Sequence, residues 1–251
     1  MKNTTIKLLL IKVLGERITS YIHGFRFALM LKFNKKKDVE FDHLSKYVKY
    51  GDTVIDVGAN GGDWTSILSE HVGGNGKVYA FEADKYYYCA TKFCLKLIGC
   101  ENVNIVNIAL GERKEQGYLN IYDESERVSG KSYINKVKSE FNIEINLDKM
   151  DSLIDINDNT NISLIKIDVE GYEMYVIRGA KQIIKEFKPV IILEIGHFEK
   201  HGYDDIIFYN ELIELGYSVN YINKKNQLKS IHHLRESDDC LSDNRVLIYN
   251  Q

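Results

Sequence analysis

Short apolar runs alternate with longer amphipathic stretches through the middle of the chain. Runs of this length, bounded by glycine or polar residues, are typical of buried strands, and the stretches between them have helical periodicity. Strands that alternate with helices predict a mostly parallel sheet with right-handed crossovers. The predicted strands span residues 54–57, 77–82, 102–110, 164–168 and 190–195, and the predicted helices span residues 64–71, 84–98 and 173–187.

The last part of the chain departs from this alternation. A helix is predicted to begin at Asp204 and Asp205, whose charges suit the positive end of a helix dipole. Two further strands are predicted at residues 217–222 and 245–249, with no helix between them. The pattern therefore predicts an α/β protein with a doubly wound, mostly parallel seven-stranded sheet that includes an antiparallel terminal hairpin.

The first 45 residues lie outside this pattern. Residues 1–45 are predicted to form an N-terminal helical segment, and residues 46–251 the main domain. Four apolar residues share one helical face, namely Ile6, Leu9, Leu10 and Val13. We expect this helix to pack on the domain or on a second copy of the chain, which would make a homo-oligomer. A helix that lies on a membrane surface is the alternative.

An insertion interrupts the main domain at residues 112–148. Its two ends alternate like exposed strands, and its polar centre includes the run Ser129-Gly130-Lys131-Ser132. Long insertions between sheet elements often form lids or binding loops, so we expect Ser132 to contact the substrate. A plain surface hairpin is the alternative.

Composition narrows the class of protein. The net charge of −3 and the isoelectric point of about 6.2 disfavour a nucleic-acid partner, which usually selects a basic protein. The four cysteines form no C-x-x-C pair, which favours reduced thiols and a cytoplasmic location. No apolar run approaches the roughly 20 residues of a membrane span, so no transmembrane segment is predicted.

Carboxylates end three of the predicted strands, at Asp56, Glu82 and Asp168. A parallel sheet presents its strand ends along one edge, so these side chains are expected to converge on one crevice. A glycine-rich turn from Gly58 to Gly62 follows the first strand and permits close approach of a ligand. Glu82, which lies 20 residues after Gly62, is placed to accept hydrogen bonds from ribose hydroxyls. The sequence therefore predicts a nucleoside site.

These motifs resemble those of the FkbM-type methyltransferases, which are class I enzymes that use S-adenosylmethionine and mostly methylate oxygen. The resemblance covers roughly residues 50–250, and the block from Lys166 to Glu173 is its most specific part. One departure is Ala83-Asp84, where the family usually has Pro-Asn. The other matching motifs are Asp56-Val57-Gly58-Ala59-Asn60, Phe81-Glu82 and Leu193-Glu194-Ile195.

The resemblance implies a Rossmann-like fold, S-adenosylmethionine as cofactor, and a hydroxyl-bearing small molecule or glycan as substrate. It also implies roles for individual residues. The cofactor-binding set comprises Asp56, Gly58 and Asn60 along the methionine part, Glu82 at the ribose, Ala109 near the adenine, and Ala59, Gly62 and Ala83 in the adjoining turns.

Methyl transfer from a sulfonium requires an aligned acceptor oxygen and a base that improves it as a nucleophile. Asp168 and His197 are the candidate bases because both are predicted at strand ends on the same crevice, and Glu170 is a third catalytic candidate. Glu173 and Glu194 are predicted to contact the substrate, although Glu173 would also suit the first turn of a helix for structural reasons alone.

Three alternatives remain at this stage. A nicotinamide-dependent oxidoreductase would have a similar sheet, but Asn60 replaces a fingerprint glycine and Asp56 would repel a pyrophosphate. A non-catalytic, partner-binding member of the family would be expected to have lost some of the motif residues. No metal site is predicted, yet Asp168, Glu170 and Glu194 offer oxygen ligands that Mg²⁺ accepts.

Overall fold

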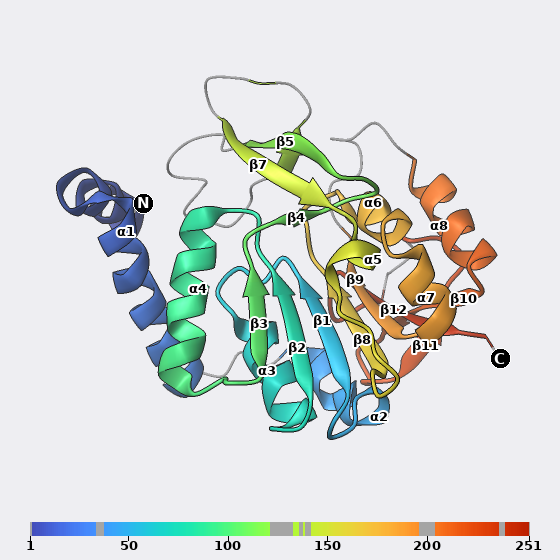
Figure 1. Cartoon of the computed structure of the whole chain (residues 1–251). Coiled ribbons are helices and arrows are strands. Elements are labelled where there is room, and N and C mark those ends of the chain that lie inside the picture. The colour runs from blue at the N-terminus through green and yellow to red at the C-terminus, as the bar shows by residue number, and fades with distance from the viewer. Residues whose placement is uncertain are drawn as a thin grey trace.

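The computed structural model describes residues 2–33, 38–120, 133–135, 138, 142–195, 204–235 and 239–250. Its central feature is an eight-stranded sheet with the order β11-β10-β12-β9-β8-β1-β2-β3 (Figure 1). The strands are β1 (Thr53–Val57), β2 (Lys77–Phe81), β3 (Val103–Val106), β8 (Ile162–Ile167), β9 (Val190–Glu194), β10 (Tyr217–Ile222), β11 (Leu228–Ser230) and β12 (Asn244–Tyr249).

The sheet is mixed, as the sequence predicted. β3, β2, β1, β8 and β9 are parallel, whereas β12, β10 and β11 are antiparallel to their neighbours. The two predicted terminal strands are adjacent and antiparallel, but the last strand, β12, lies between β9 and β10. The expected number of strands was too small by one, because the short β11 pairs with β10 at the edge.

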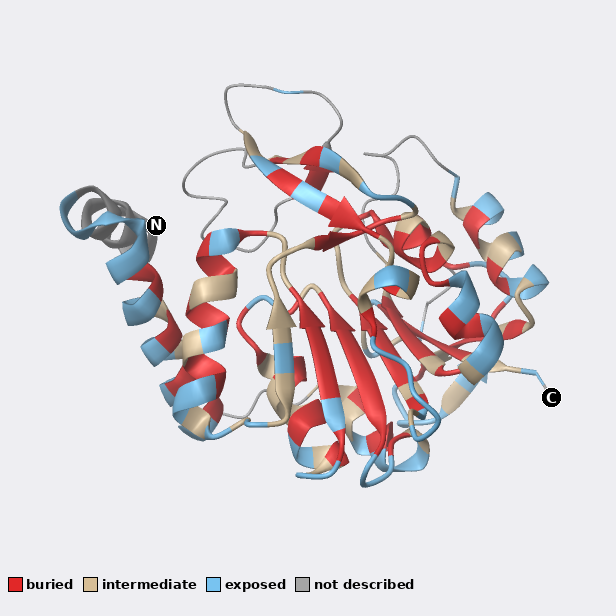
Figure 2. Ribbon diagram, viewed as in Figure 1, coloured by how far each residue is buried: buried red, intermediate tan, exposed pale blue. Residues whose placement is uncertain are grey.

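Helices cover both faces of this sheet because its strands are apolar on both sides (Figure 2). Val54 and Leu164 pack with Trp64 and Leu68 on one face, while Ile55 and Ile165 belong to the larger core on the other. The helical elements are α1 (Lys2–Phe33), η1 (Val39–His43), α2 (Leu44–Tyr47), α3 (Asp63–Val72), α4 (Lys85–Ile98), α5 (Met150–Leu153), α6 (Glu173–Arg178), α7 (Lys181–Phe187) and α8 (Asp205–Glu214).

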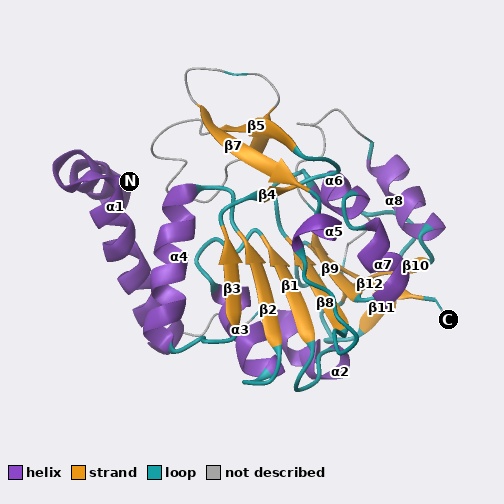
Figure 3. Cartoon of the chain, in the orientation of Figure 1, coloured by secondary structure: helices purple, strands orange, loops and turns teal. Residues whose placement is uncertain are grey.

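A second, four-stranded sheet lies across the carboxyl ends of the main strands (Figure 3). It comprises β4 (Ala109–Leu110), β5 (Glu115–Asn120), β6 (Tyr133–Asn135) and β7 (Asn142–Asp148), in the order β4-β7-β5-β6. The described part of the insertion is therefore a small sheet with its own apolar side, at which Leu119, Ile134 and Leu147 pack together with Tyr172. A plain hairpin would not bury these side chains.

Two predicted elements are divided in the structure. The strand expected over residues 102–110 is split into β3 and β4, because the chain turns at Asn107, whose side-chain amide donates to the carbonyls of Glu82 and Ala83. The helix expected over residues 173–187 is split into α6 and α7. The backbone of Gly179 lies so close to Gly111 that a Cβ there would meet the Gly111 carbonyl oxygen at 1.9 Å.

The helix α1 lies along α4, at the edge of the molecule (Figure 1). It is interrupted at Gly15, whose φ of 78° is not helical. Beyond this break, Gly24 lies directly against the backbone of Ala90, and Ala28 and Leu31 pack with Cys94. None of the helices in the described part of the chain combines the length and apolar character that a membrane crossing requires.

Candidate active site

The turn after β1 brings the backbone against the neighbouring strand β8. Gly58 has a φ of 88°, and a Cβ at this position would lie 1.9 Å from the carbonyl oxygen of Asp168. The amides of Gly58 and Ala59 both donate to the carbonyl of Phe81, at 2.9 and 3.0 Å. Glycine is therefore required at position 58 by both its backbone conformation and the lack of space.

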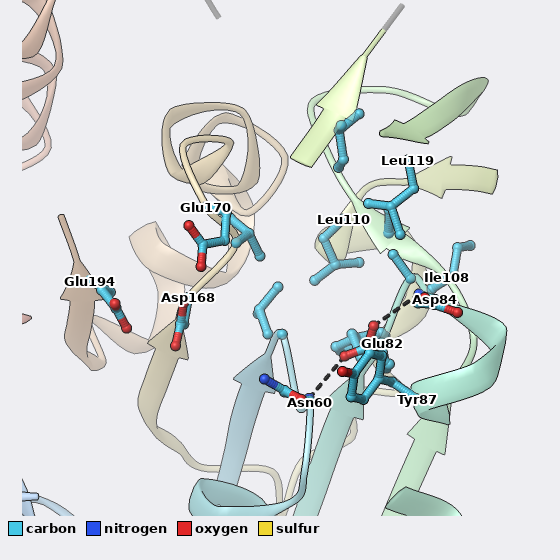
Figure 4. Close-up of a pocket in the computed structure, with 17 residues that line it drawn as sticks. Asn60, Glu82, Asp84, Tyr87, Ile108, Leu110, Leu119, Asp168, Glu170 and Glu194 are labelled. Carbon is cyan, nitrogen blue, oxygen red and sulfur yellow. Dashed lines mark hydrogen bonds between the residues drawn. The ribbon is translucent and has the colours of Figure 1, made fainter. Parts of the chain in front are cut away.

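Glu82 joins this turn to the end of β2 (Figure 4). One carboxylate oxygen accepts a hydrogen bond from the Asn60 amide and the other from the Asp84 amide, each at 2.9 Å. Burial raises the pKa of the Glu82 carboxyl to about 7. Asp84 in turn caps α4 by accepting from the Tyr86 amide at 2.8 Å. The glycine-rich turn after β1 and the acidic end of β2 are thus joined by hydrogen bonds.

A cavity opens beside Glu82, between the two sheets. Its wall is polar near Asn60, Glu82 and Asp84, apolar beneath the second sheet, and acidic at the ends of β8 and β9. The side chains and backbone that line it belong to Val57, Gly58, Asn60, Phe81, Glu82, Ala83, Asp84, Tyr87, Ile108, Ala109, Leu110, Leu119, Ile134, Asp168, Val169, Glu170 and Glu194.

The acidic end is built around a buried lysine. Lys166, which is 1% exposed, places Nζ 3.9 Å from an Asp168 carboxylate oxygen and 3.8 Å from one of Glu194. The same Nζ donates to the Asn244 side chain at 2.9 Å and lies 5.4 Å from the centre of the Trp64 ring. Burial and the neighbouring Asp168 raise the pKa of the Glu194 carboxyl to about 8.

A second cavity meets the first at Gly58, Asn60, Asp168 and Glu194. Its far side is formed by η1 and the residue before it. Asp38 accepts from the Trp64 indole N–H at 3.0 Å, and the buried Glu40 accepts from the Ser242 hydroxyl. The second Glu40 carboxylate oxygen has no hydrogen-bond partner within the residues that the structure describes. Asp38, Glu40, Asp63 and Asp243 make this cavity strongly acidic.

Most of the residues predicted from the sequence converge on these cavities. The first cavity is lined by Gly58, Asn60, Glu82, Ala83, Ala109, Asp168, Glu170 and Glu194, and Ala59 lines the second. His197 and Ser132 lie outside the described residues. For the residues that line a cavity, the position agrees with a role in binding or catalysis, but the individual roles stay predictions.

Three predicted contact residues line neither cavity. Asp56 is 1% exposed and accepts from the Thr65 hydroxyl at 2.5 Å, on the face covered by α3. Gly62 has a φ of 86° and precedes the first residue of α3. Glu173 is fully buried and accepts from the Gly171 amide at 2.9 Å. Asp56 and Glu173 each make a hydrogen bond within the protein, and the roles predicted for all three residues stay predictions.

The sequence analysis did not single out Lys166, which contacts two of the predicted site carboxylates. Its signal was available, since a lysine in an otherwise apolar strand, two residues before Asp168, must share a face with that carboxylate. Asp38 and Glu40, which line the second cavity, were also missed, because they belong to the N-terminal segment, residues 1–45, in which no site residue was predicted. No local pattern connects that segment to the strand ends.

Metal binding gains no support from the geometry. Within the described part of the chain, no cluster of three or more His, Cys, Asp or Glu side chains is arranged to hold an ion. The Mg²⁺ alternative therefore rests on the sequence alone.

Comparisons with solved structures show the fold. The methyltransferase FkbM from Methylobacillus flagellatus KT aligns with a TM-score of 0.50 and 14% identity over 96% of this chain, which spans only 60% of that protein. A putative rRNA methylase from Clostridium thermocellum aligns with a TM-score of 0.50 and 15% identity, over 84% of this chain and 94% of the other. A search of curated proteins found no significant relative.

The family is established by sequence. The profile of the methyltransferase FkbM domain matches residues 56–219, which is well over half of the chain. The matched region begins at Asp56 and includes the Lys166–Glu173 block and the second sheet. It also includes Glu82 with its hydrogen bonds to the backbone amides of Asn60 and Asp84, which we call the Glu82 clamp. The chain therefore belongs to the FkbM family of S-adenosylmethionine-dependent methyltransferases.

Proposed function

We propose that this protein transfers a methyl group from S-adenosylmethionine to a hydroxyl group of a sugar or glycan. The observation that carries the proposal is the Glu82 clamp at the wall of a cavity that is apolar on one side and acidic on the other. The sugar or glycan acceptor rests on the family resemblance. The transfer to oxygen rests on the same resemblance, and the cofactor rests on the family match together with the hydrogen bonds and charge of the site.

The residues present suit this cofactor. The Glu82 carboxylate is held rigidly at the cavity wall, where its remaining lone pairs can accept from ribose hydroxyls. Ile108, Ala109 and Leu119 offer an apolar surface for an adenine ring. When bound, the cofactor supplies an activated methyl group on a positively charged sulfur.

The charge of the site suits S-adenosylmethionine better than a dinucleotide cofactor. The charged residues that line the two cavities are all carboxylates, and no lysine, arginine or histidine is among the lining residues that the structure describes. Such a surface attracts a sulfonium and an ammonium and repels a pyrophosphate. This argument favours S-adenosylmethionine over a nicotinamide cofactor.

Asp168 is the base that the geometry favours. It lies at the cavity wall at the end of β8, beside Glu194 and the Lys166 ammonium. From this position at the cavity wall, the Asp168 carboxylate can accept the proton of an acceptor hydroxyl. The carboxyl of Glu194 and the ammonium of Lys166 lie beside the Asp168 carboxylate and stabilise its negative charge.

The first experiment is calorimetric titration of the purified protein with S-adenosylhomocysteine, with NAD as the control ligand. We expect micromolar binding of S-adenosylhomocysteine and none of NAD. Nucleotide sugars and glycans are then screened for methyl transfer from labelled S-adenosylmethionine. Binding of NAD alone, or of neither ligand, would contradict the proposed cofactor, and methylation of only non-sugar hydroxyls would contradict the proposed acceptor.

A further inference from the structure

The outer face of α1 is an apolar stripe without a partner in the described structure. Nine of the sixteen exposed large apolar side chains that the structure describes lie between Val13 and Phe33. Five of them recur three or four residues apart and therefore share one side of the helix. The exposed fractions are 52% for Ile18, 39% for Ile22, 51% for Phe25, 42% for Leu29 and 73% for Phe33.

This stripe lies opposite the side of α1 that packs on the domain. Gly24, Ala28 and Leu31 face α4, where Gly24 approaches the Ala90 backbone and the other two join a small core. In Figure 2 the pale blue side of α1 is turned away from α4. Packing on α4 therefore fixes the helix without covering the stripe, and substitutions in the stripe do not disturb that packing.

The charge of the chain is divided sharply at this segment. Residues 1–37 contain nine lysine and arginine residues and one acidic residue, Glu16, which gives +8. Since the whole chain carries −3, residues 38–251 carry −11. Arg26 and Lys32 are exposed beside the apolar stripe. An anionic surface would therefore attract the basic helix α1 and repel the acidic remainder of the chain.

We propose that the outer face of α1 binds the surface of an anionic phospholipid membrane. Helices of this type lie in the interface with apolar side chains among the acyl chains and basic side chains at the headgroups. The negative surface potential of such a membrane attracts each nearby lysine or arginine. The acidic main domain is repelled by the same potential and so faces away from the lipid.

The charge also decides against a second copy of this chain as the occupant. Two stripes that pack face to face would bring the exposed Arg26 and Lys32 of both chains close together, and like charges repel. A lipid surface offers apolar contact and opposite charge at once. Self-association through α1 is therefore an outcome that the test must detect separately.

The test is cosedimentation of the full chain with vesicles of phosphatidylcholine alone and with vesicles that also contain phosphatidylserine. We expect binding to the anionic vesicles that weakens as the salt concentration rises, and little binding to the neutral ones. The double variant Phe25→Ser/Leu29→Ser should bind at least about tenfold more weakly, because two inserted apolar side chains are lost. The matched control Ile206→Ser/Ile207→Ser removes two exposed apolar side chains from α8 and should bind like the wild type.

A second variant, Arg26→Glu/Lys32→Glu, tests the electrostatic part and should also bind about tenfold more weakly. Thermal melting checks that each variant is folded, and sedimentation velocity without lipid measures self-association. Failure of the wild type to bind anionic vesicles, or equal binding by the Phe25→Ser/Leu29→Ser variant, would overturn the proposal. A dimer that this variant dissociates, with no lipid binding, would assign the face to a second copy instead.

Discussion

Lys166 organises the acidic end of the site at the level of single residues. A buried ammonium requires compensation, and it obtains this from Asp168, Glu194, the Asn244 amide and the face of Trp64. Its charge stabilises the ionised pair, whereas burial and the neighbouring Asp168 favour the protonated form of Glu194. The raised pKa of Glu194 therefore reflects burial and Asp168 acting against the neighbouring Lys166 ammonium.

Replacing Asp168 with asparagine tests its proposed role as the base. Asp168→Asn preserves the shape of the side chain but removes the base, so kcat should fall by about 10²- to 10⁴-fold. Affinity for S-adenosylhomocysteine should change little. The measurement is steady-state methyl transfer to the acceptor found by screening, with Glu170→Gln as the matched loss of another cavity carboxylate. If Glu170→Gln loses more turnover than Asp168→Asn, the base is Glu170.

The pKa of Glu82 predicts how cofactor affinity depends on pH. Burial raises this pKa to about 7, and the ionised form is the better acceptor for ribose hydroxyls. Affinity for S-adenosylhomocysteine should therefore fall about tenfold as pH decreases from 8 to 6. Titration calorimetry of Glu82→Gln should show weaker binding without this step. A variant with the wild-type pH profile would remove Glu82 from the ribose role.

At the scale of elements, the turn between β1 and α3 is the most constrained part of the site. It lies against the end of β8 at Gly58, is bonded to β2 through Phe81 and Glu82, and starts α3 at Gly62. The same close approach of backbones occurs where Gly179 meets Gly111 beneath the second sheet. Glycine at these positions lets backbone segments approach each other closely around the cavities.

Alanine at position 58 tests the need for this close approach. Gly58→Ala would force a Cβ against the Asp168 carbonyl and hold a side chain at a φ of 88°, so we expect a loss of at least about 2 kcal/mol in the free energy of unfolding. Gly74→Ala is the control, since nothing lies within 4 Å of the added atom there. Urea denaturation of both variants measures the difference. Equal stability of the two would contradict the crowded geometry.

For the molecule as a whole, buried carboxyl groups near the site make the free energy of unfolding depend on pH. Burial raises the pKa of Asp56 to about 6 and that of Glu173 to about 7. A carboxyl whose pKa is raised by folding stabilises the protein while it is protonated, so its contribution is complete below the unfolded pKa and is lost as pH rises through the folded one. The free energy of unfolding should therefore decrease between about pH 4.5 and pH 8 at these sites.

Glu173→Gln isolates one of these contributions. The wild type should lose on the order of 3 kcal/mol from this carboxyl between pH 5 and pH 8, and the variant should not, because glutamine has no charge to bury. The measurement is urea denaturation at both pH values, with the exposed Glu186→Gln on α7 as the control. An identical loss in all three proteins would show that Glu173 is not responsible.

The sequence by itself determined the order of strands and helices and the edge where the site lies. Strands that are buried on both faces of a sheet are apolar along their length and can be recognised in the sequence. Because parallel strands end at the same edge, Glu82, Asp168 and Glu194 lie at that edge independently of the loop conformations. Gly58 and the block from Lys166 to Glu173 also indicated that the site lies at this edge.

Only the tertiary structure decided which side chains reach the cavities. The sheet is covered on both faces, so a position along β1 cannot tell whether Asp56 meets solvent or the Thr65 hydroxyl on α3. The place of β12 between β9 and β10, the second sheet over the strand ends, and the arrival of Asp38 and Glu40 at the site all depend on pairing between distant segments. Local periodicity reports the burial of a residue, but the partner that buries it is chosen by the whole fold.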